Sequence, residues 1–188
     1  MKEIFERMRQ LALPYLRQEI KKDAVLHTQG VINAMELLLE KEKGDEDILI
    51  PTAILHDVGW AKVPVELQKS NNEADKLEAS RLHLKHAPSI INKILTEVGY
   101  NRSQIEKVID IVVAHKFQNP KELEKQLLID ADAMSDAFKE QFYSDIESYN
   151  TTPQEHYEFR KRNEFYTKTA RELFDREVET RRREIQMS

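Results

Sequence analysis

The apolar stretch at residues 48–55 constrains the fold more than any other feature. It reads Ile-Leu-Ile-Pro-Thr-Ala-Ile-Leu and leads directly into His56 and Asp57. Asp45 or Asp47 could cap the helix that carries it. Because the stretch is apolar nearly throughout, we predict that this helix lies at the centre of the protein and delivers a histidine and an aspartate at its end.

The composition predicts the class of fold and the surroundings of the protein. Only four Gly and six Pro occur among 188 residues, and 34% of the residues are charged. The chain is rich in Glu, Lys, Leu, Ile and Ala, which favour helix, so we predict an all-α bundle that forms one domain over residues 1–188. Cysteine is absent, which excludes disulfides and thiolate chemistry and suits a reducing cytoplasm.

Other features exclude some partners. The charged start of the chain resembles neither a signal peptide nor a transit peptide. No apolar run reaches the roughly 18–20 residues that a membrane span needs. The formal net charge of −5 gives no general attraction to nucleic acid. We therefore expect a cytoplasmic protein without a membrane or nucleic-acid partner, and the oligomeric state is left open, with a homodimer among the alternatives.

Hydrophobic periodicity and capping signals predict a series of helices joined by short connections. Two capping boxes are expected, at 103–106 and at 152–155. Residues 58–75, with their Gly, Pro, Ser and Asn, are expected to form a loop. The expected helices cover residues 3–20, 23–43, 45–57, 75–85, 86–99, 103–115, 119–134 and a long C-terminal helix at about 153–185.

Four histidines recur at intervals of 29 or 30 residues: His27, His56, His86 and His115. Each interval roughly fits one helix and a connection, so these side chains could meet inside a bundle. Imidazole and carboxylate are ligands of divalent metals, and a set without cysteine favours a catalytic site over a structural zinc site. Taken singly, His27 or His115 is better explained as a core histidine bonded to a backbone carbonyl, but buried His and Asp at five separate places need a shared partner.

This pattern resembles the HD superfamily of metal-dependent phosphohydrolases, whose motifs would cover about residues 23–138. In that family the first His, a His-Asp doublet and a distal Asp bind a divalent metal. Asp132 fits the distal position better than Asp130, because it stands in an Ala-Asp-Ala-Met context; Asp130 would support the site or cap a helix. The resemblance thus implies metal binding by His27, His56, Asp57 and Asp132.

Some branches of the family add two histidines and bind a second metal. The resemblance assigns these positions to His86 and His115, with His83 as a rival that lies in a charged stretch. The expected cofactor is therefore one or two divalent ions per chain, such as Mn, Fe, Ni or Mg.

The resemblance also implies the reaction. It is hydrolysis of a phosphoester or phosphoanhydride in a small molecule, most often a nucleotide, with Asp57 and Lys62 as catalytic residues. The family often has Lys directly after the Gly of this motif, whereas Trp60 and Ala61 precede Lys62 here, so Lys62 could equally be an ordinary loop residue. Residues expected to hold the substrate phosphate are Lys62, Arg81, Arg160 and Arg162, although a solvated charged face explains them as well.

Two other functions remain open at this point. The same scaffold with a di-iron centre supports oxygenases, which oxygen consumption would reveal. A non-catalytic signalling or binding module is the other alternative, and an absence of bound metal would favour it.

Overall fold

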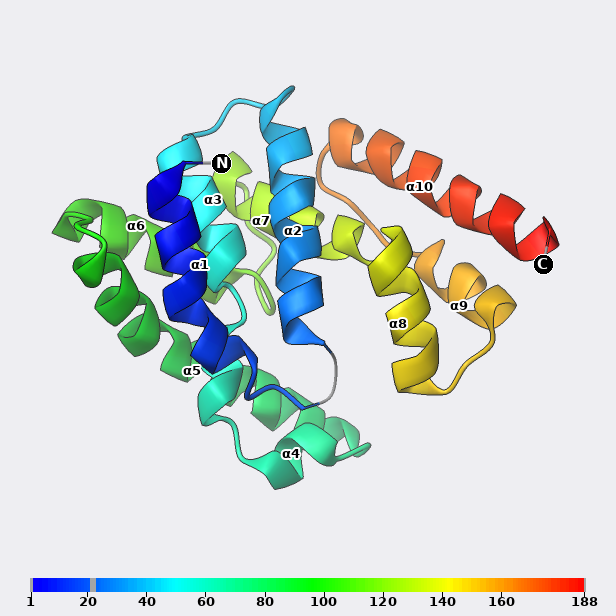
Figure 1. Ribbon diagram of the computed structural model, residues 1–188, viewed down its shortest axis with the longest axis horizontal. Helices are drawn as coiled ribbons and strands as arrows, with labels where there is room; N and C mark the ends of the chain where they lie inside the picture. Colours follow the sequence, from blue (N-terminus) through cyan, green and yellow to red (C-terminus); the bar gives the residue numbers. More distant parts are fainter. Residues whose placement is uncertain (1, 21–22, 188) are drawn as a thin grey trace.

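The computed structural model describes residues 2–20 and 23–187, which form an all-α protein and confirm the predicted fold class (Figure 1). That residues 1–188 form one domain stays a prediction. Within the described residues the helices are α1 (Glu3–Leu16), α2 (Ala24–Leu39), α3 (Glu46–Leu55), the 3-10 helix η1 (Val58–Lys62), α4 (Val65–Lys69), α5 (Glu73–Glu97), α6 (Arg102–Ala114), α7 (Leu123–Ser135), α8 (Lys139–Tyr149), α9 (Pro153–Arg160) and α10 (Lys168–Met187).

Helix α3 is the central element, as predicted. Every residue from 48 to 55 is buried, and α1, α2, α6 and α7 pack around the helix. Asp45 caps its start, because the Asp45 side chain accepts a hydrogen bond from the backbone N–H of Asp47 at 3.0 Å. The apolar stretch thus delivers His56 and Asp57 to the middle of the molecule.

Helices α2 and α7 approach one another closely. A Cβ atom built on Gly30 of α2 would lie 3.0 Å from the Cβ atom of Ser135 on α7. Asp23 caps α2 by accepting hydrogen bonds from the backbone N–H groups of Val25 and Leu26. Because the helices lie this close, His27 of α2 can reach side chains of the neighbouring helix.

The predictions for residues 58–99 are wrong. They gave a loop at 58–75 and two separate helices at 75–85 and 86–99. Residues 58–75 contain η1 and α4, and one continuous helix, α5, runs from Glu73 to Glu97. Pro88 does not interrupt α5, although it removes one backbone hydrogen bond. Buried apolar side chains along one face of α5 stabilise the helix, and Gly99, with φ +88°, ends it as predicted.

Two predicted helix starts are corrected, and one helix was not predicted. The capping box of α6 is formed by Asn101 and Gln104, so that helix begins before the predicted box at 103–106. Helix α7 begins at Leu123 rather than at 119, and α8 was not predicted. The capping box at 152–155 is confirmed, with Pro153 at the first position of α9.

The prediction of one long C-terminal helix is also wrong. Helix α9 ends at Arg160, and seven residues separate it from α10, which begins at Lys168. Asp130, buried on α7, explains the break: its carboxylate accepts hydrogen bonds from the backbone N–H groups of Tyr166 and Thr167 and from the Thr167 hydroxyl, at 2.7–2.9 Å. This carboxylate holds the chain in a turn directly before α10.

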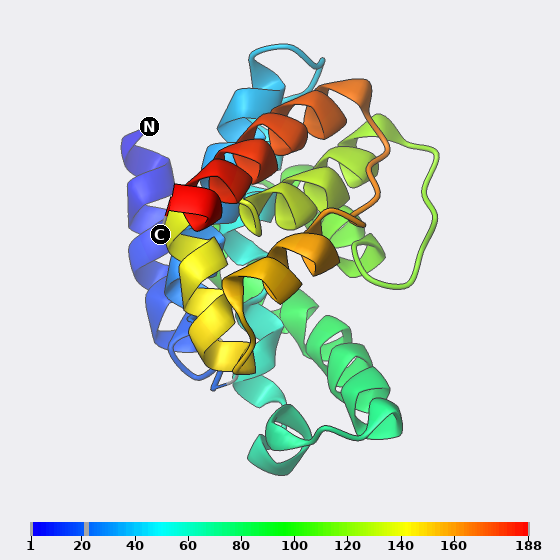
Figure 2. The same ribbon diagram turned by 90° about the vertical axis from the view of Figure 1, so that its right-hand side faces the viewer.

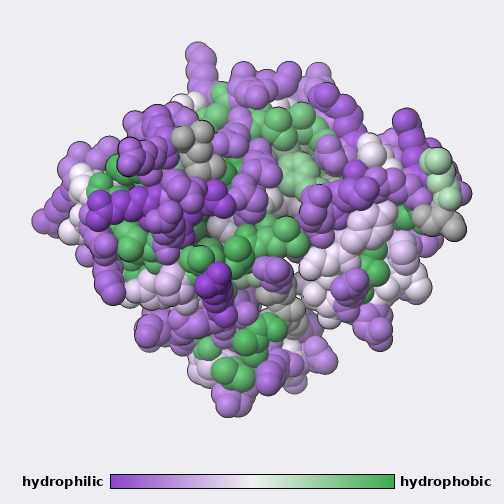
Figure 3. Space-filling model, viewed as in Figure 1, coloured by the Kyte–Doolittle hydropathy of each residue, from purple (hydrophilic) through white to green (hydrophobic). Residues whose placement is uncertain are grey.

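The last helices lie together on one side of the molecule. Figure 2 shows α9 and α10 on the same face, with α8 beside them. Figure 3 shows a surface that is mainly hydrophilic in this view, with smaller hydrophobic areas. In the part of the chain that the structure describes, no helix combines the length and the apolar character needed to cross a bilayer.

Candidate metal centre

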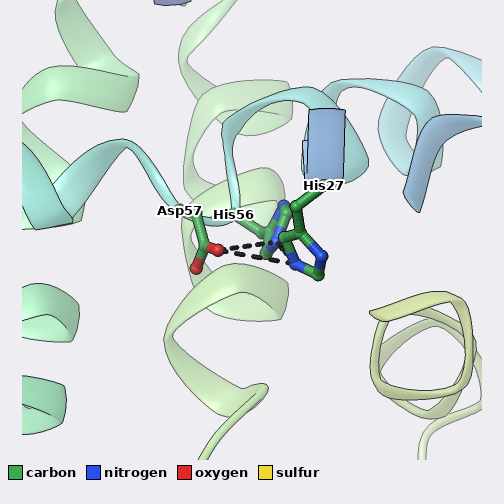
Figure 4. A group of neighbouring side chains, drawn as sticks. All are labelled: His27, His56 and Asp57. Carbon is green, nitrogen blue, oxygen red and sulfur yellow. Dashed lines mark hydrogen bonds and ion pairs between the residues drawn. The ribbon is translucent and has the colours of Figure 1, made fainter. Parts of the chain in front are cut away.

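Asp57 lies at the centre of a buried cluster of histidines. Its Oδ2 atom lies 3.2 Å from His56 Nε2 and 3.6 Å from His27 Nε2, as Figure 4 shows. Its Oδ1 atom lies 3.6 Å from His83 Nε2 and 3.9 Å from His115 Nε2. All five residues are buried. The carboxylate therefore stands between two pairs of histidines, one pair at each oxygen atom.

Four segments of the chain bring these five residues together. His27 belongs to the first turn of α2, whereas His56 directly follows α3 and Asp57 precedes η1. His83 lies in the middle of α5, and His115 directly follows α6. In each of two groups, one ligand atom from every residue lies within 4.8 Å of the others; the groups are His27, His56 and Asp57, and Asp57, His83 and His115.

Backbone carbonyls fix the protonation of two of the rings. His56 Nδ1 lies 2.9 Å from the carbonyl oxygen of Ala53, and His115 Nδ1 lies 2.5 Å from that of Val112. Because a carbonyl oxygen only accepts, each Nδ1 carries the proton and donates it. In the neutral form of each ring the lone pair therefore lies on Nε2, which faces the Asp57 carboxylate.

His27 is oriented in the same way from α7. The Ser135 hydroxyl donates to the carbonyl oxygen of Asp132 at 2.8 Å, so at 3.2 Å it accepts from His27 Nδ1. His27 Nε2 then directs its lone pair toward Asp132 Oδ1, 3.0 Å away, as well as toward Asp57. Lone pairs and carboxylate oxygens repel one another unless a cation lies between them, so this donor set fits a divalent metal.

The charges of the site shift the pKa values of three of its members. Burial lowers the pKa of His115 well below its ordinary value, helped by the charge of Lys116, so this ring is neutral at pH 7. Burial would also lower the pKa of His56, but the adjacent Asp57 carboxylate raises it above the ordinary value. Burial would raise the pKa of Asp132, yet the charge of Lys116 holds it well below its usual range.

One predicted ligand is corrected. The structure places His83, and not His86, beside Asp57; His86 is only half-buried, three residues further along α5. The buried face of α5 repeats every three or four residues at positions 79, 83, 87, 90, 91 and 94. His83 belongs to this stripe and His86 does not. The helical periodicity was the signal, and the prediction of two separate helices at 75–85 and 86–99 concealed it.

Trp60 was missed as a member of the site. Its Nε1–H donates to Asp57 Oδ1 at 3.2 Å, and its indole stacks on the His83 ring with centroids 5.0 Å apart and planes 9° apart. Gly59 makes this packing possible, because a Cβ atom at that position would lie 2.1 Å from the His83 carbonyl oxygen. The only signal in the sequence is that Trp60 follows the His-Asp motif directly.

A polar hollow of about 410 Å³ opens on the solvent side of His27 and Asp132. Two cations line it. Lys116, also missed from the sequence, contacts Asp132 Oδ2 at 2.8 Å. Arg160, which was predicted, is held by Asp136 at 2.6 Å and by Asp145 at 2.5 Å.

The other predicted phosphate-binding residues lie elsewhere. Lys62, Arg81 and Arg162 are exposed at the surface and are not among the described residues that line the hollow. Their expected contact with a substrate phosphate stays a prediction. Lys62 is the last residue of η1.

Comparison with known proteins agrees with the geometry. No curated protein and no solved structure matches the chain. The family model of the HD domain matches residues 25–137, a range that covers more than half of the chain and includes every histidine and aspartate of the cluster. The chain therefore belongs to the HD domain family.

Proposed function

We propose that this protein is a metal-dependent phosphohydrolase that acts on a small phosphorylated molecule of the nucleotide type. The observation that carries the proposal is the Asp57 carboxylate between two pairs of histidines, where Nε2 lone pairs and carboxylate oxygens converge. Membership of the HD domain family supports it, because that family generally consists of metal-dependent phosphohydrolases.

The cluster divides into two sets of ligands that share Asp57. One ion would be held by His27, His56, Asp57 and Asp132, and a second by Asp57, His83 and His115. Divalent ions bound there would act as Lewis acids toward phosphoryl oxygens and lower the pKa of a coordinated water. The backbone and hydroxyl partners of His27, His56 and His115 fix the direction in which each ring offers its lone pair.

The hollow beside Asp132 suits the phosphoryl group of a substrate. Lys116, Arg160 and the amide group of Asn163 line it, together with the carboxylates that hold the two cations and with Glu164. Because His27 and Asp132 line the hollow, a metal ion held by them would supply the positive charge that attracts the anionic substrate and stabilises charge on the phosphoryl oxygens. The burial of the histidines behind the hollow keeps bulk water away from the rest of the cluster.

The test combines metal analysis with phosphate release. Protein purified without chelators should contain one or two divalent ions per chain and should release inorganic phosphate from some members of a nucleotide panel with Mn or Fe. Asp57→Ala should lose metal and lower turnover by more than about 100-fold, because both sets of ligands lose their shared member. The helical circular dichroism signal should be retained.

Two results would contradict the proposal. Metal-loaded protein that consumes oxygen with its substrate and releases no phosphate would indicate a di-iron oxygenase. Protein that binds no metal under any loading condition would indicate a non-catalytic module.

A further inference from the structure

A second and larger cavity adjoins the polar hollow. Its volume is about 640 Å³, within the usual range for sites that bind small organic molecules. Tyr149 and Arg160 line both spaces, so the two are neighbours. The cavity lies between α4 and the start of α5 on one side and the end of α8 and α9 on the other; Figure 1 shows α4 at the bottom and α8 and α9 at the right.

The walls of this cavity are rich in aromatic surface. Tyr149 and Phe159 expose 48% and 60% of their surface. Large aromatic side chains left exposed beside a cavity are well suited to cover a flat ring of a ligand. The apolar lining consists of Trp60, Leu67, Ala79, Tyr149 and Phe159.

Trp60 connects the cavity to the metal centre. The same indole that lines the cavity stacks on His83 and donates a hydrogen bond to Asp57. A molecule in contact with Trp60 is therefore one side chain away from the metal ligands. This distance suits a group that is joined directly to the reacting phosphoryl group.

The charges on the walls argue against a second phosphate in this cavity. Glu19 and Glu155 contribute carboxylates to the described lining. The two lining cations are engaged by acidic partners: Lys76 contacts Glu73 at 2.5 Å, and Arg160 is held by two aspartates. Unlike the lining of the polar hollow, the described lining of this cavity contains no member of the histidine cluster, so no bound metal ion would offset these carboxylates. The cavity therefore suits an uncharged group.

We infer that this cavity is the leaving-group subsite, and that the substrate is a phosphomonoester of an uncharged, flat-ringed alcohol of nucleoside size. The inference rests on the proposed function. In the reaction a water oxygen forms a bond to phosphorus, the ester P–O bond breaks, and the leaving oxygen takes up a proton from that water. The cavity then releases a nucleoside, and the polar hollow releases inorganic phosphate. A nucleoside monophosphate is preferred over the corresponding triphosphate.

Binding to the subsite can be measured without catalysis. The chain contains one tryptophan, so its fluorescence reports on Trp60 alone. Adenosine should change this fluorescence saturably, and glycerol at the same concentrations should not. Ser80→Phe places a ring inside the cavity and should weaken adenosine binding by at least about tenfold, as expected for the loss of a stacking contact. Ser89→Phe is the matched control, since Ser89 is exposed on the same helix outside the cavity lining.

A second variant guards against misfolding of Ser80→Phe. Phe159→Ala removes an exposed ring from the rim and should also weaken adenosine binding while the fold is retained. In the activity assay, both variants should lower kcat/KM for adenosine monophosphate and leave kcat/KM for glycerol phosphate within about twofold, because the phosphoryl site is unchanged.

The outcomes separate the two proposals. Absence of a saturable fluorescence change with adenosine, or an equal loss of kcat/KM for both substrates, overturns the subsite even if the protein hydrolyses phosphoesters. Adenosine binding that Ser80→Phe abolishes, in a protein that hydrolyses no phosphorylated compound with any metal, contradicts the proposed function and supports a cavity that binds aromatic groups.

Discussion

At the scale of single residues, Asp57 combines two tasks that neighbouring side chains make possible. Each of its oxygens faces a different pair of histidines, and Trp60 fixes the rotation of the carboxylate by donating to Oδ1. A carboxylate held in this way would offer one oxygen to each of the two sets of ligands. Replacing it removes a ligand from both sets, whereas replacing a histidine should affect one.

His83 allows this division to be tested. Where the protein binds two ions per chain, His83→Ala should lower the metal content to one and reduce turnover by at least about tenfold, because only the ion shared by Asp57, His83 and His115 loses a protein ligand. His86→Ala, three residues away on α5, should retain both ions. Elemental analysis of the two variants measures the metal content of each. An equal loss of metal from both variants, or a loss of metal from His86→Ala alone, would contradict the assignment of His83 as a ligand.

The scale of helices shows which features could be predicted from local sequence. The apolar run of α3, the capping box at 152–155 and the stop at Gly99 depend on neighbours within a few residues, and these predictions were confirmed. The break between α9 and α10 depends on Asp130, which lies 36 residues before Tyr166. No local pattern encodes that contact, so the helix was predicted to continue.

The same reason explains which parts of the site were missed. His27, His56, Asp57 and Asp132 stand in motifs that are recognisable along the chain. His83, Trp60 and Lys116 join them through the packing of η1 on α5 and of α6 on α7. The pairing of α5 with η1 decides which histidine of α5 reaches Asp57, and it becomes visible only in three dimensions.

Asp130 and Asp132 provide a test at the scale of a helix. Asp130→Ala should destabilise the protein by about 2–3 kcal/mol, because the backbone N–H groups of residues 166 and 167 and the Thr167 hydroxyl lose their shared acceptor. Its metal content should be unchanged. Asp132→Ala should instead bind metal more weakly and change the free energy of unfolding less than Asp130→Ala does. Denaturant titration measures the unfolding free energy of both variants. Loss of metal in Asp130→Ala with no loss in Asp132→Ala would exchange the two roles.

At the scale of the whole molecule, the cluster joins helices that are far apart in the sequence. Its ligands come from α2, the end of α3, α5, the end of α6 and α7, whereas α8, α9 and α10 contribute none among the described residues. Ions bound at this point would therefore link the central helices to one another. The C-terminal helices are held instead by Asp130 and by the ion pairs of Arg160 with Asp136 and Asp145.

Metal removal should consequently weaken the molecule unevenly. A ligand at 100 times its Kd stabilises the folded state by about 2.7 kcal/mol, which corresponds to a rise in Tm of about 5–10 °C for a chain of this size. Hydrogen exchange should show the added protection in α2, α3, α5, α6 and α7, with little change in α10, because no ligand lies on that helix. Asp57→Ala should show neither the rise in Tm nor the added protection. An equal rise in that variant would mean that the ions bind outside the cluster, and uniform protection that includes α10 would mean that the C-terminal helices unfold together with the central ones.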